Sequence, residues 1–521
     1  MYAYRPETAK TTPRKTAGPP SEELRIAVTF PRSDGGPGPT KFDAPLSTAT
    51  VQRFVPDPLE MDKAIHSLAK LGFTVTQRGR LTASVRGTRG LFEKVFGTKL
   101  TKVEVDTREN YAFHSFYYPA QGAPWSPSPD VVRFIDDAYI QWPHIYMRSA
   151  GARRQPQRVG PQAAPAVVVV PSDTPPVVDY FHLEMPQDVP TVLNANRVHT
   201  AGTTGRGIRV VMVDTGFAHR LHPFFAAHGF TSTVDLAPHA TNDKSDRNGH
   251  GTGESTNVFA VAPGATFIGI KVENDDDPNR GASMLEGFQA ALQHQPHVIS
   301  ISMGFDLRDD NGRQLTELPG SLAALEAEIQ AAIAAGIVVV FSAGNGHFSF
   351  PGMMPDVISA GGVFVDEQGD MRASDYASAF DSKTYSGRHV PDFCGLVGLL
   401  PHASYIMLPI PEGCKIDSEV SQPDDGLPGD GTQPADGWGV FSGTSAAAPQ
   451  LAGVCALLLE KNPGLKPSEI KAILRRTSRD VLVGSSNPAS DDNGVAQQAG
   501  PGDDGATGAG LVDAFAAFQQ A

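Results

Sequence analysis

Apolar residues in the first part of the chain follow a helical period in places and a strand pattern in others. Between Asp57 and Leu71 they recur at Met61, Ile65 and Leu68, a spacing that places them on one face of a helix. A second helix is expected at about Arg89–Phe96. Short apolar or alternating runs predict strands at Leu24–Phe30, Phe73–Gln77, Arg80–Arg86 and Lys102–Asp106. The order βαββαβ predicts a small α+β domain of ferredoxin-like topology.

From Gly207 the pattern changes to near-continuous apolar strands that alternate with helices. The expected strands are Ile208–Val213, Thr266–Val272, Val298–Met303, Ile337–Ser342 and Val357–Val365, and the expected helices are about Ser283–His294 and Gly320–Ala335. This alternation predicts an α/β fold, a parallel sheet flanked by helices. The working residues of such sheets collect at the carboxyl ends of the strands.

Composition divides the chain into four parts. We expect a disordered tail at residues 1–22, the small domain at 23–147, a linker at 148–189 and the α/β domain at 190–521. The linker is rich in Pro, Ala and Gln and contains the pair Arg153-Arg154. This composition is typical of a flexible segment that proteases can reach.

Charge and cysteine content limit the class of partner and compartment. The net charge of −14 argues against nucleic acid or an anionic membrane as a partner. No apolar run approaches the roughly 20 residues of a membrane span. Met1–Gly18 lacks the apolar stretch of a secretory signal, so the compartment stays open, with the cytoplasm and non-classical export as the alternatives. The three cysteines cannot form a disulfide framework; Cys455 is expected to be a buried thiol, and pairing of Cys394 with Cys414 stays open.

Four polar residues of the α/β domain end or follow a predicted strand, or begin a predicted helix. Asp214 ends one strand and Asn345 follows another, while His250 begins an apolar helix that runs to Val261. Ser445 begins an apolar helix near the C-terminus, where unpaired backbone N–H groups favour a developing negative charge. Each residue alone is a common turn or cap residue. Together they could supply a nucleophile, a base, an orienting acid and an oxyanion donor.

The motifs around these residues, in this order, resemble those of the subtilisin-like serine peptidases (S8 type). They are Asp214-Thr215-Gly216, His250-Gly251-Thr252-Gly253, Ala343-Gly344-Asn345 and Ser442-Gly443-Thr444-Ser445-Ala446-Ala447-Ala448-Pro449. The resemblance covers roughly residues 190–516 and implies a subtilisin-like serine endopeptidase. It implies that Ser445 attacks the peptide carbonyl, His250 takes its proton and Asp214 orients the imidazole. Asn345, with the backbone N–H of Ser445, would stabilise the oxyanion, and this chemistry requires no cofactor.

The segment Leu71–Leu100 resembles the activation domain of pro-kumamolisin (sedolisin) peptidases. This implies a prodomain that assists folding and acts as an intramolecular inhibitor of a zymogen. The prodomain would block the groove for protein or peptide substrates until the linker is cut.

The subtilisin-like resemblance also implies a substrate groove. Ser302, Met303 and Gly304 match the strand that pairs with the substrate backbone, and Ala343 and Gly344 would form the wall of the P1 pocket. No acidic residue is evident at these positions, so an apolar or permissive P1 is expected.

Two features depart from the family pattern. Family members usually have His where this chain has Gly253, and an apolar residue where it has Glu254. Glu254 is four residues after His250 on the same predicted helix, so the two side chains could meet. A Gly-, Pro- and Asp-rich insertion at about 412–437 precedes the serine and is expected to be a surface loop.

A structural calcium site is one interpretation of the C-terminal region. Its candidate residues, which resemble the calcium loop of sedolisins, are Asp480, Val481, Gly500, Gly502 and Asp504. Carboxylate and carbonyl oxygens are the ligands that Ca²⁺ takes. An acidic, Gly-rich loop without metal is the alternative.

Two other functions stay open on the sequence. One is a sedolisin-like acid peptidase, which the N-terminal segment and the C-terminal loop suggest. The other is a catalytically silent peptide-binding protein on a peptidase scaffold.

Overall fold

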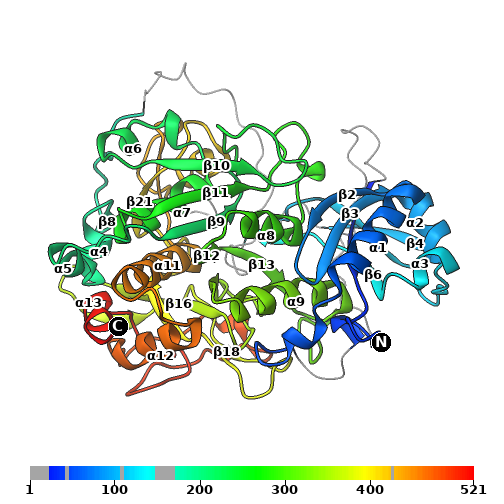
Figure 1. The fold of residues 1–521 in the computed structure, drawn as a ribbon. Helices are drawn as coiled ribbons and strands as arrows, with labels where there is room; N and C mark the ends of the chain where they lie inside the picture. The colour runs from blue at the N-terminus through cyan, green and yellow to red at the C-terminus, as the bar shows by residue number, and fades with distance from the viewer. Residues whose placement is uncertain (1–22, 42–45, 106–110, 147–170, 424–427) are drawn as a thin grey trace.

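The computed structural model describes residues 23–41, 46–105, 111–146, 171–423 and 428–521. The expected tail at 1–22 and most of the expected linker lie outside these residues. The chain forms a small N-terminal domain beside a larger α/β domain (Figure 1). The two domains meet where strands β2 (Thr74–Arg78) and β3 (Thr82–Thr88) approach helices α8 (Met284–Gln293) and α9 (Gly320–Ala334).

The N-terminal domain is built on a four-stranded antiparallel sheet. Its strand order is β2-β3-β1-β6, with β1 at Glu23–Thr29 and β6 at Asp137–Ile140. Helix α1 (Pro58–Leu71) lies between β1 and β2 in the chain, and helix α2 (Arg89–Phe96) lies between β3 and β6. The ferredoxin-like order is therefore present.

The fourth strand of this sheet is not the one that the sequence pattern suggested. The run expected as strand Lys102–Asp106 lies in β4 (Leu100–Glu104), which pairs with β5 (Ser115–Pro119) in a separate hairpin, and Asp106 lies outside the described residues. The place beside β1 is taken by β6, some 30 residues later in the chain. The expectation was wrong because a short amphipathic strand specifies its own conformation but not its partner.

Local signals explain the bounds of the N-terminal helices. The Asp57 carboxylate accepts hydrogen bonds from the backbone of Leu59 and Glu60 at the start of α1, with Pro58 at the first helical position. Gly72 ends the same helix at φ 105°, a left-handed conformation that favours glycine. On the inner face, Met61 and Leu68 are buried, so α1 packs on the sheet through the face that the spacing predicted.

The α/β domain contains the expected parallel sheet. Its strand order is β10-β11-β9-β12-β14-β16-β17, with β20 also paired to β16, and all neighbours are parallel except the pair β16 and β17. The strands are β9 (Arg209–Asp214), β10 (Ser232–Leu236), β11 (Thr266–Lys271), β12 (Val298–Ile301), β14 (Val338–Ser342), β16 (Ile358–Val365), β17 (Met371–Ala373) and β20 (Phe393–Leu396). The predicted α/β fold is thus confirmed.

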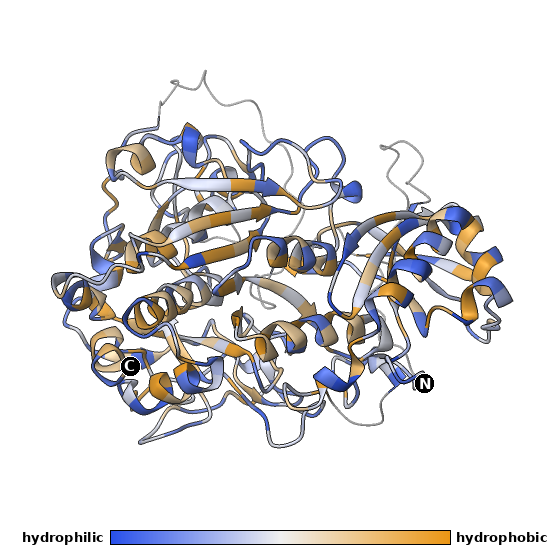
Figure 2. Ribbon diagram, viewed as in Figure 1, coloured by the Kyte–Doolittle hydropathy of each residue, from blue (hydrophilic) through white to orange (hydrophobic). Residues whose placement is uncertain are grey.

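Both faces of this sheet are buried. Along β9, Val210 and Met212 belong to one core cluster, while Val211 and Val213 belong to another on the opposite face. The first cluster includes helices α7 (His250–Val261) and α11 (Thr444–Lys461), and the second includes α8 and α9. This two-sided burial explains why β9 is apolar at nearly every position, as its orange colour in Figure 2 shows.

The remaining elements cover the rim and the C-terminal side of the α/β domain. They include helices α4 (Asp188–Val192), α5 (Ala195–Thr200), α6 (Pro223–Ala227), α10 (Lys415–Val420), α12 (Pro467–Thr477) and α13 (Ala514–Gln520), and strands β7 (Ile145–Tyr146), β8 (Leu183–Glu184), β13 (Met303–Asp306), β15 (Ser349–Phe350), β18 (Phe380–Asp381), β19 (His389–Val390), β21 (Ile406–Pro409) and β22 (Trp438–Val440). The short helix α3 (Pro129–Val132) belongs to the N-terminal domain.

Residues 171–189, which the composition predicts to be linker, contact the α/β domain. Strand β8 runs parallel to β21, with Leu183 opposite Ile406. Leu183 and Met185 are both buried in the main core of this domain. This part of the chain therefore packs as part of the α/β domain.

The insertion at 412–437 is also more ordered than expected in its described part. It contains helix α10, and the backbone N–H groups of Lys415 and Ile416 donate to the carbonyls of Arg247 and Asn248 at 2.9 and 3.0 Å. Because Asn248 lies two residues before the first residue of α7, His250, the insertion supports the loop that leads into that helix.

All three cysteines are buried free thiols. Cys394 and Cys414 are therefore not joined in a disulfide. No helix within the described residues is long and apolar enough to cross a membrane.

Candidate active site

The four candidate residues lie at the carboxyl edge of the parallel sheet, each carried by a different element. Asp214 ends β9, His250 is the first residue of α7, and Asn345 follows β14. Ser445 is the second residue of α11. The structure thus brings together residues separated by up to 231 positions in the sequence.

Asp214 and His250 form the closest pair in the group. The Asp214 Oδ1 atom lies 2.7 Å from His250 Nδ1 and also accepts a hydrogen bond from the backbone of Thr215 at 2.7 Å. The side chain of Asp214 is fully buried. This contact fixes the proton of the neutral imidazole on Nδ1 and leaves Nε2 as the basic atom.

Gly251 allows the helix of His250 to lie against the loop of Asp214. A Cβ atom at Gly251 would come within 2.3 Å of the Gly216 carbonyl oxygen and 2.9 Å of the Asp214 Cβ. The space beside Gly253, where family members usually have His, is filled by Phe441 and Ile410, which a Cβ atom would meet at 2.8 and 3.0 Å. The glycines thus set the close packing of α7.

Asp246 is a buried residue of the site that the sequence analysis missed. Its carboxylate accepts hydrogen bonds from the backbone of Gly249 and Thr252, and from the hydroxyls of Thr215 and Thr252, all at 2.8–2.9 Å. These contacts tie the start of α7 to the loop after β9. An Asp four residues before the candidate His was the available signal, because Asp often accepts hydrogen bonds from a nearby helix start.

Carboxyl groups surround His250 and act on its charge. Burial alone would lower the pKa of His250, but Asp214, by charge and hydrogen bond, and then Glu254 and Asp246, by charge, raise it to about 9. The protonated imidazole is the form produced when a base takes a proton from serine. The surroundings of His250 therefore favour the product of that step.

Glu254 is near His250, as its position on the helix suggested, but it is almost fully buried. Burial raises the pKa of Glu254 to about 8, the charge of His250 opposes this rise, and that of Asp214 adds to it. Its Oε2 atom accepts a hydrogen bond from the Asn257 side chain at 3.2 Å within the same helix.

Ser445 and Ser302 contact each other through two hydrogen bonds. The Ser302 hydroxyl donates to the Ser445 carbonyl at 2.9 Å, and the Ser445 hydroxyl donates to the Ser302 carbonyl at 3.4 Å. The second bond is long and weak. The Ser445 hydroxyl is therefore held only loosely, and the hydrogen bonds of catalytic groups often form fully only when substrate is bound.

Asn345 is oriented by the residue that precedes Ser445. Its Oδ1 atom accepts hydrogen bonds from the backbone and the hydroxyl of Thr444, at 3.0 and 2.9 Å. The amide nitrogen Nδ2 therefore points toward Gly443, where a Cβ atom would lie only 2.8 Å from it. Glycine at 443 leaves this donor room beside the start of α11.

A segment of the N-terminal domain occupies the candidate substrate groove. Strand β7 pairs antiparallel with β13, with Tyr146 opposite Met303 and Ile145 opposite Gly304. The ring centroid of Tyr146 lies 6.3 Å from that of His250. Met303 and Gly304 thus pair with a peptide backbone in this structure, as a substrate strand would.

The other two groove candidates lie beside this strand. Ala343 is buried in the core cluster that contains Met303 and Tyr146. The backbone N–H of Gly344 donates to the Thr444 hydroxyl at 3.2 Å. Ala343 and Gly344 therefore join the strand of Met303 to the start of α11.

The proposed calcium ligands already contact protein donors. Asp480 accepts two 3.1 Å hydrogen bonds from Gly502, and Asp504 accepts from Gly500, Ala506 and Thr507. Val481 is a fully buried core residue. Across the described part of the chain, no group of three or more His, Cys, Asp or Glu side chains could hold a metal ion. These hydrogen bonds within the loop favour the alternative, an acidic and Gly-rich loop without metal.

Comparison with known proteins agrees with this architecture. The chain matches the subtilase family (Peptidase_S8) over residues 205–510, more than half its length. The protein belongs to this family.

Two relatives illustrate the similarity. Alkaline elastase YaB from Bacillus sp. (strain YaB) is 27% identical over 312 residues, which cover 57% of this chain and 66% of the elastase. Subtilisin Savinase from Lederbergia lenta is 26% identical over 309 residues, 57% of this chain and 91% of the relative.

A solved structure resembles nearly the whole chain. It is fervidolysin from Fervidobacterium pennivorans, described as a keratinolytic enzyme related to subtilisin, with a TM-score of 0.51 and 18% identity. The match covers 95% of this chain and 61% of fervidolysin, so the likeness of fold extends into the N-terminal domain.

Proposed function

We propose that this chain is a serine endopeptidase made as an autoinhibited zymogen. In this proposal residues 23–147 are the prodomain, and the peptidase domain follows the linker. Its substrates are proteins or peptides bound in extended form along β13. The observation that carries the proposal is the pairing of β7 with β13 beside His250, which fills the groove with the chain's own backbone.

Each candidate residue has one role in the reaction. His250 Nε2 takes the proton of Ser445 as its oxygen attacks the substrate carbonyl, and later gives the proton to the leaving amine. Asp214 orients the imidazole and stabilises its positive charge. The amide of Asn345 and the backbone N–H of Ser445 donate to the oxyanion of the tetrahedral intermediate.

The interface between the domains supports the inhibitory role. The Arg86 guanidinium donates to both carboxylate oxygens of Glu286 on α8, at 3.0 and 2.8 Å, with both side chains almost fully buried. The same Glu286 accepts a hydrogen bond from the Ser283 backbone at the start of α8. The prodomain is thus fixed to the helix cap of the peptidase domain, which places β7 at the groove.

The sedolisin-like alternative finds less support. It would use a carboxyl of α7 as the base, but Glu254 is 1% exposed and accepts a hydrogen bond from Asn257 in its own helix. His250, in contrast, lies beside both Asp214 and the groove segment.

Labelling with a serine-directed fluorophosphonate tests the proposal. Wild-type protein, once processed, should take up one label and appear as two fragments on a gel. Ser445→Ala should stay unlabelled and full length. Ser442→Ala is the matched control, because the Ser442 hydroxyl donates to the Leu396 carbonyl away from the reaction, and it should behave as wild type. Wild-type protein that stays unlabelled after the N-terminal domain has been removed would favour a silent binding protein instead.

A further inference from the structure

The segment in the groove shows which residues face each substrate position. In the antiparallel pair, Tyr146 stands opposite Met303. A substrate residue one step further along would stand opposite Ser302, whose carbonyl oxygen is 3.4 Å from Ser445 Oγ. That residue would carry the carbonyl that is attacked. Tyr146 therefore marks the position of the second substrate residue before the cleaved bond, the P2 residue.

The side chain at this position is enclosed. Tyr146 is 5% exposed, and its ring contacts the rings of His250 and His144 at centroid distances of 6.3 and 5.4 Å. Burial raises the pKa of Tyr146 well above its usual value, and the negative charge of Glu273 is the next cause. Yet the Tyr146 hydroxyl has no hydrogen-bond partner of ordinary geometry among the described residues. Tyr146 is thus a neutral phenol, and Glu273 is the carboxyl group that acts on it most strongly. The Glu273 backbone N–H donates to the Thr215 carbonyl at 3.3 Å, one residue after Asp214.

Glu273 has no close cationic partner in the described part of the chain. It follows β11 by two residues, and the hydrogen bond that it accepts from the Asn248 side chain is long, at 3.4 Å. Lys271, the lysine nearest in sequence, donates instead to Asp275 at 2.6 Å and to Ser245. Burial and the nearby charge of Asp246 raise the pKa of Glu273 to about 8, against the smaller opposing effects of Lys271 and Lys415. These surroundings of Glu273 favour the binding of a positively charged side chain.

We propose that Glu273 is the specificity residue of the P2 subsite and selects substrates with lysine or arginine at P2. This inference rests on the proposed peptidase function. A long basic side chain in the place of Tyr146 would pass the ring of His250, as the Tyr146 ring does. It would bring a cationic donor to Glu273, where a charge-assisted hydrogen bond can form.

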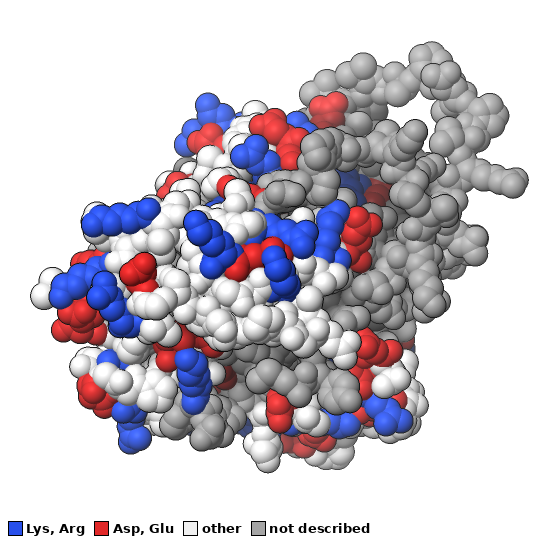
Figure 3. All heavy atoms as spheres, turned by 90° about the vertical axis from the view of Figure 1, so that its right-hand side faces the viewer, with Lys and Arg blue, Asp and Glu red and all other residues white. Residues whose placement is uncertain are grey.

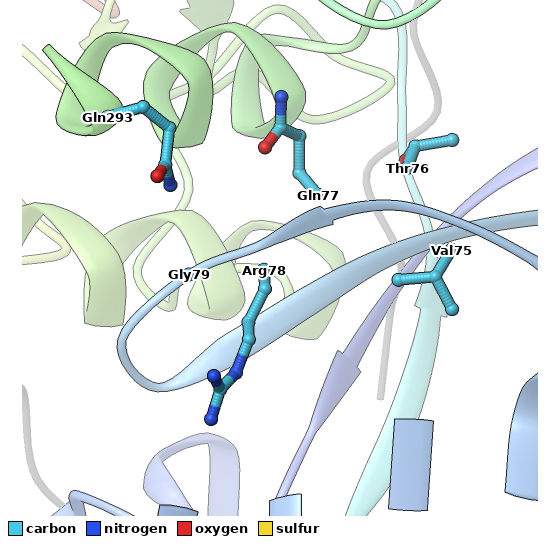
Figure 4. A pocket seen from close by; sticks show the side chains of 6 residues that line it. All are labelled: Val75, Thr76, Gln77, Arg78, Gly79 and Gln293. Atoms are coloured by element: carbon cyan, nitrogen blue, oxygen red, sulfur yellow. The ribbon is translucent and has the colours of Figure 1, made fainter. Parts of the chain in front are cut away.

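The cavity at the domain junction lacks such a combination. This cavity, of about 500 Å³, is lined by Val75, Thr76, Gln77, Arg78, Gly79 and Gln293. Figure 4 shows Gln77 and Gln293 on one side of β2 and Arg78 on the other. None of its lining residues belongs to the active site. On the face of the N-terminal domain, basic and acidic side chains are interspersed, so no single-sign patch marks a docking surface in that view (Figure 3).

Fluorogenic peptides that differ only at P2 test the proposal. The series His-Ile-X-Met, with X as Lys, Tyr, Ala or Glu and a C-terminal aminocoumarin, copies the chain's own sequence around Tyr146. We expect kcat/KM of the processed wild-type enzyme to be about tenfold higher for Lys than for Ala, and lowest for Glu. The Lys-to-Ala ratio should rise between pH 6 and pH 9, as the Glu273 carboxyl ionises.

Two variants make the test specific. Glu273→Gln should reduce the Lys-to-Ala ratio to near one and abolish its pH dependence. Asp276→Asn is the matched control, because it removes an exposed carboxylate three residues away, and it should keep the wild-type ratio. A ratio near one in wild type, or an unchanged ratio in Glu273→Gln, would overturn the P2 proposal alone. Absence of hydrolysis of every peptide, without fluorophosphonate labelling, would overturn the proposed peptidase function instead.

Discussion

The Glu328 carboxylate on α9 accepts hydrogen bonds from both the backbone N–H and the hydroxyl of Thr82, at 2.7 and 2.8 Å. It also accepts from the backbone of Arg80 and Leu81, so one carboxylate satisfies the turn between β2 and β3 of the N-terminal domain. Gly79 in this turn allows the approach, because a Cβ atom there would lie 2.2 Å from Glu328 Oε1. This contact is a second anchor of the proposed prodomain, beside Arg86 and Glu286.

Glu328→Gln should weaken the hold of the proposed prodomain on the α/β domain. The amide nitrogen cannot accept from the buried N–H groups of the turn, so we expect about 10- to 100-fold faster release of the processed prodomain. Recovery of peptidase activity after dilution of the processed complex measures this release. Glu326→Gln is the control on the same helix, because Glu326 pairs with Tyr385 inside the peptidase domain. Equal release from both variants would contradict the anchoring role.

The register of β7 on β13 predicts the bond that is cut in processing. If the residue after Tyr146 carries the attacked carbonyl, the bond is Met147–Arg148 and the mature chain begins at Arg148. Terminal sequencing of the processed enzyme checks this, with Ser445→Ala as the uncleaved control. A single start far inside 148–189 would show that another segment is cut first.

Glu254→Gln should move the acidic limb of the kcat/KM profile to lower pH. The negative charge of Glu254 is among the causes that raise the pKa of His250, so its removal makes the imidazole easier to deprotonate. Because the two groups titrate together, we expect a shift of the apparent pKa by up to about one unit. The profile is measured on the processed enzyme, with Glu326→Gln as a buried carboxyl control. An unchanged limb would remove Glu254 as a modulator of His250.

Local signals predicted most of the elements, and the order of motifs predicted which residues meet. The helix expected from His250 to Val261 has those bounds. The signals that define it, Gly249 before its start and the apolar run within it, are local in the sequence. The place of β6 in the N-terminal sheet, and the pairing of Tyr146 with Met303, could not be predicted in this way. Both depend on pairing between segments separated by 100 residues or more, which no local pattern encodes.

Chelation of calcium should leave the stability of the protein unchanged. Asp480 and Asp504 already accept hydrogen bonds from backbone N–H groups, so a cation would have to displace those donors. We expect the same Tm with excess EDTA and with millimolar calcium. A rise in Tm that depends on calcium concentration would show a binding site in the native state and contradict this expectation.

Acid should release the prodomain through His144. This residue is fully buried, and neither ring nitrogen has a hydrogen-bond partner among the described residues. Burial, and then the positive charge of Arg25 on the neighbouring strand, lower the pKa of His144 to about 3. When the segment that contains His144 is released into water, the pKa of His144 returns to about 6.5. The docked state therefore loses stability as pH falls from 6.5 toward 3, and keeps it above 6.5.

The size of this effect can be tested on the processed complex. Protonation of His144 should make the docking of the proposed prodomain about 30-fold weaker at pH 5 than at pH 7.5. His144→Phe keeps an uncharged ring and should lose most of this dependence, while His66→Phe, on the exposed face of α1, should keep it. Acid also acts on His219 and His222, whose pKa values are lowered by burial in the α/β domain, so only the difference between the variants reports on docking. Equal pH dependence of release in wild type and His144→Phe would exclude His144 as the sensor.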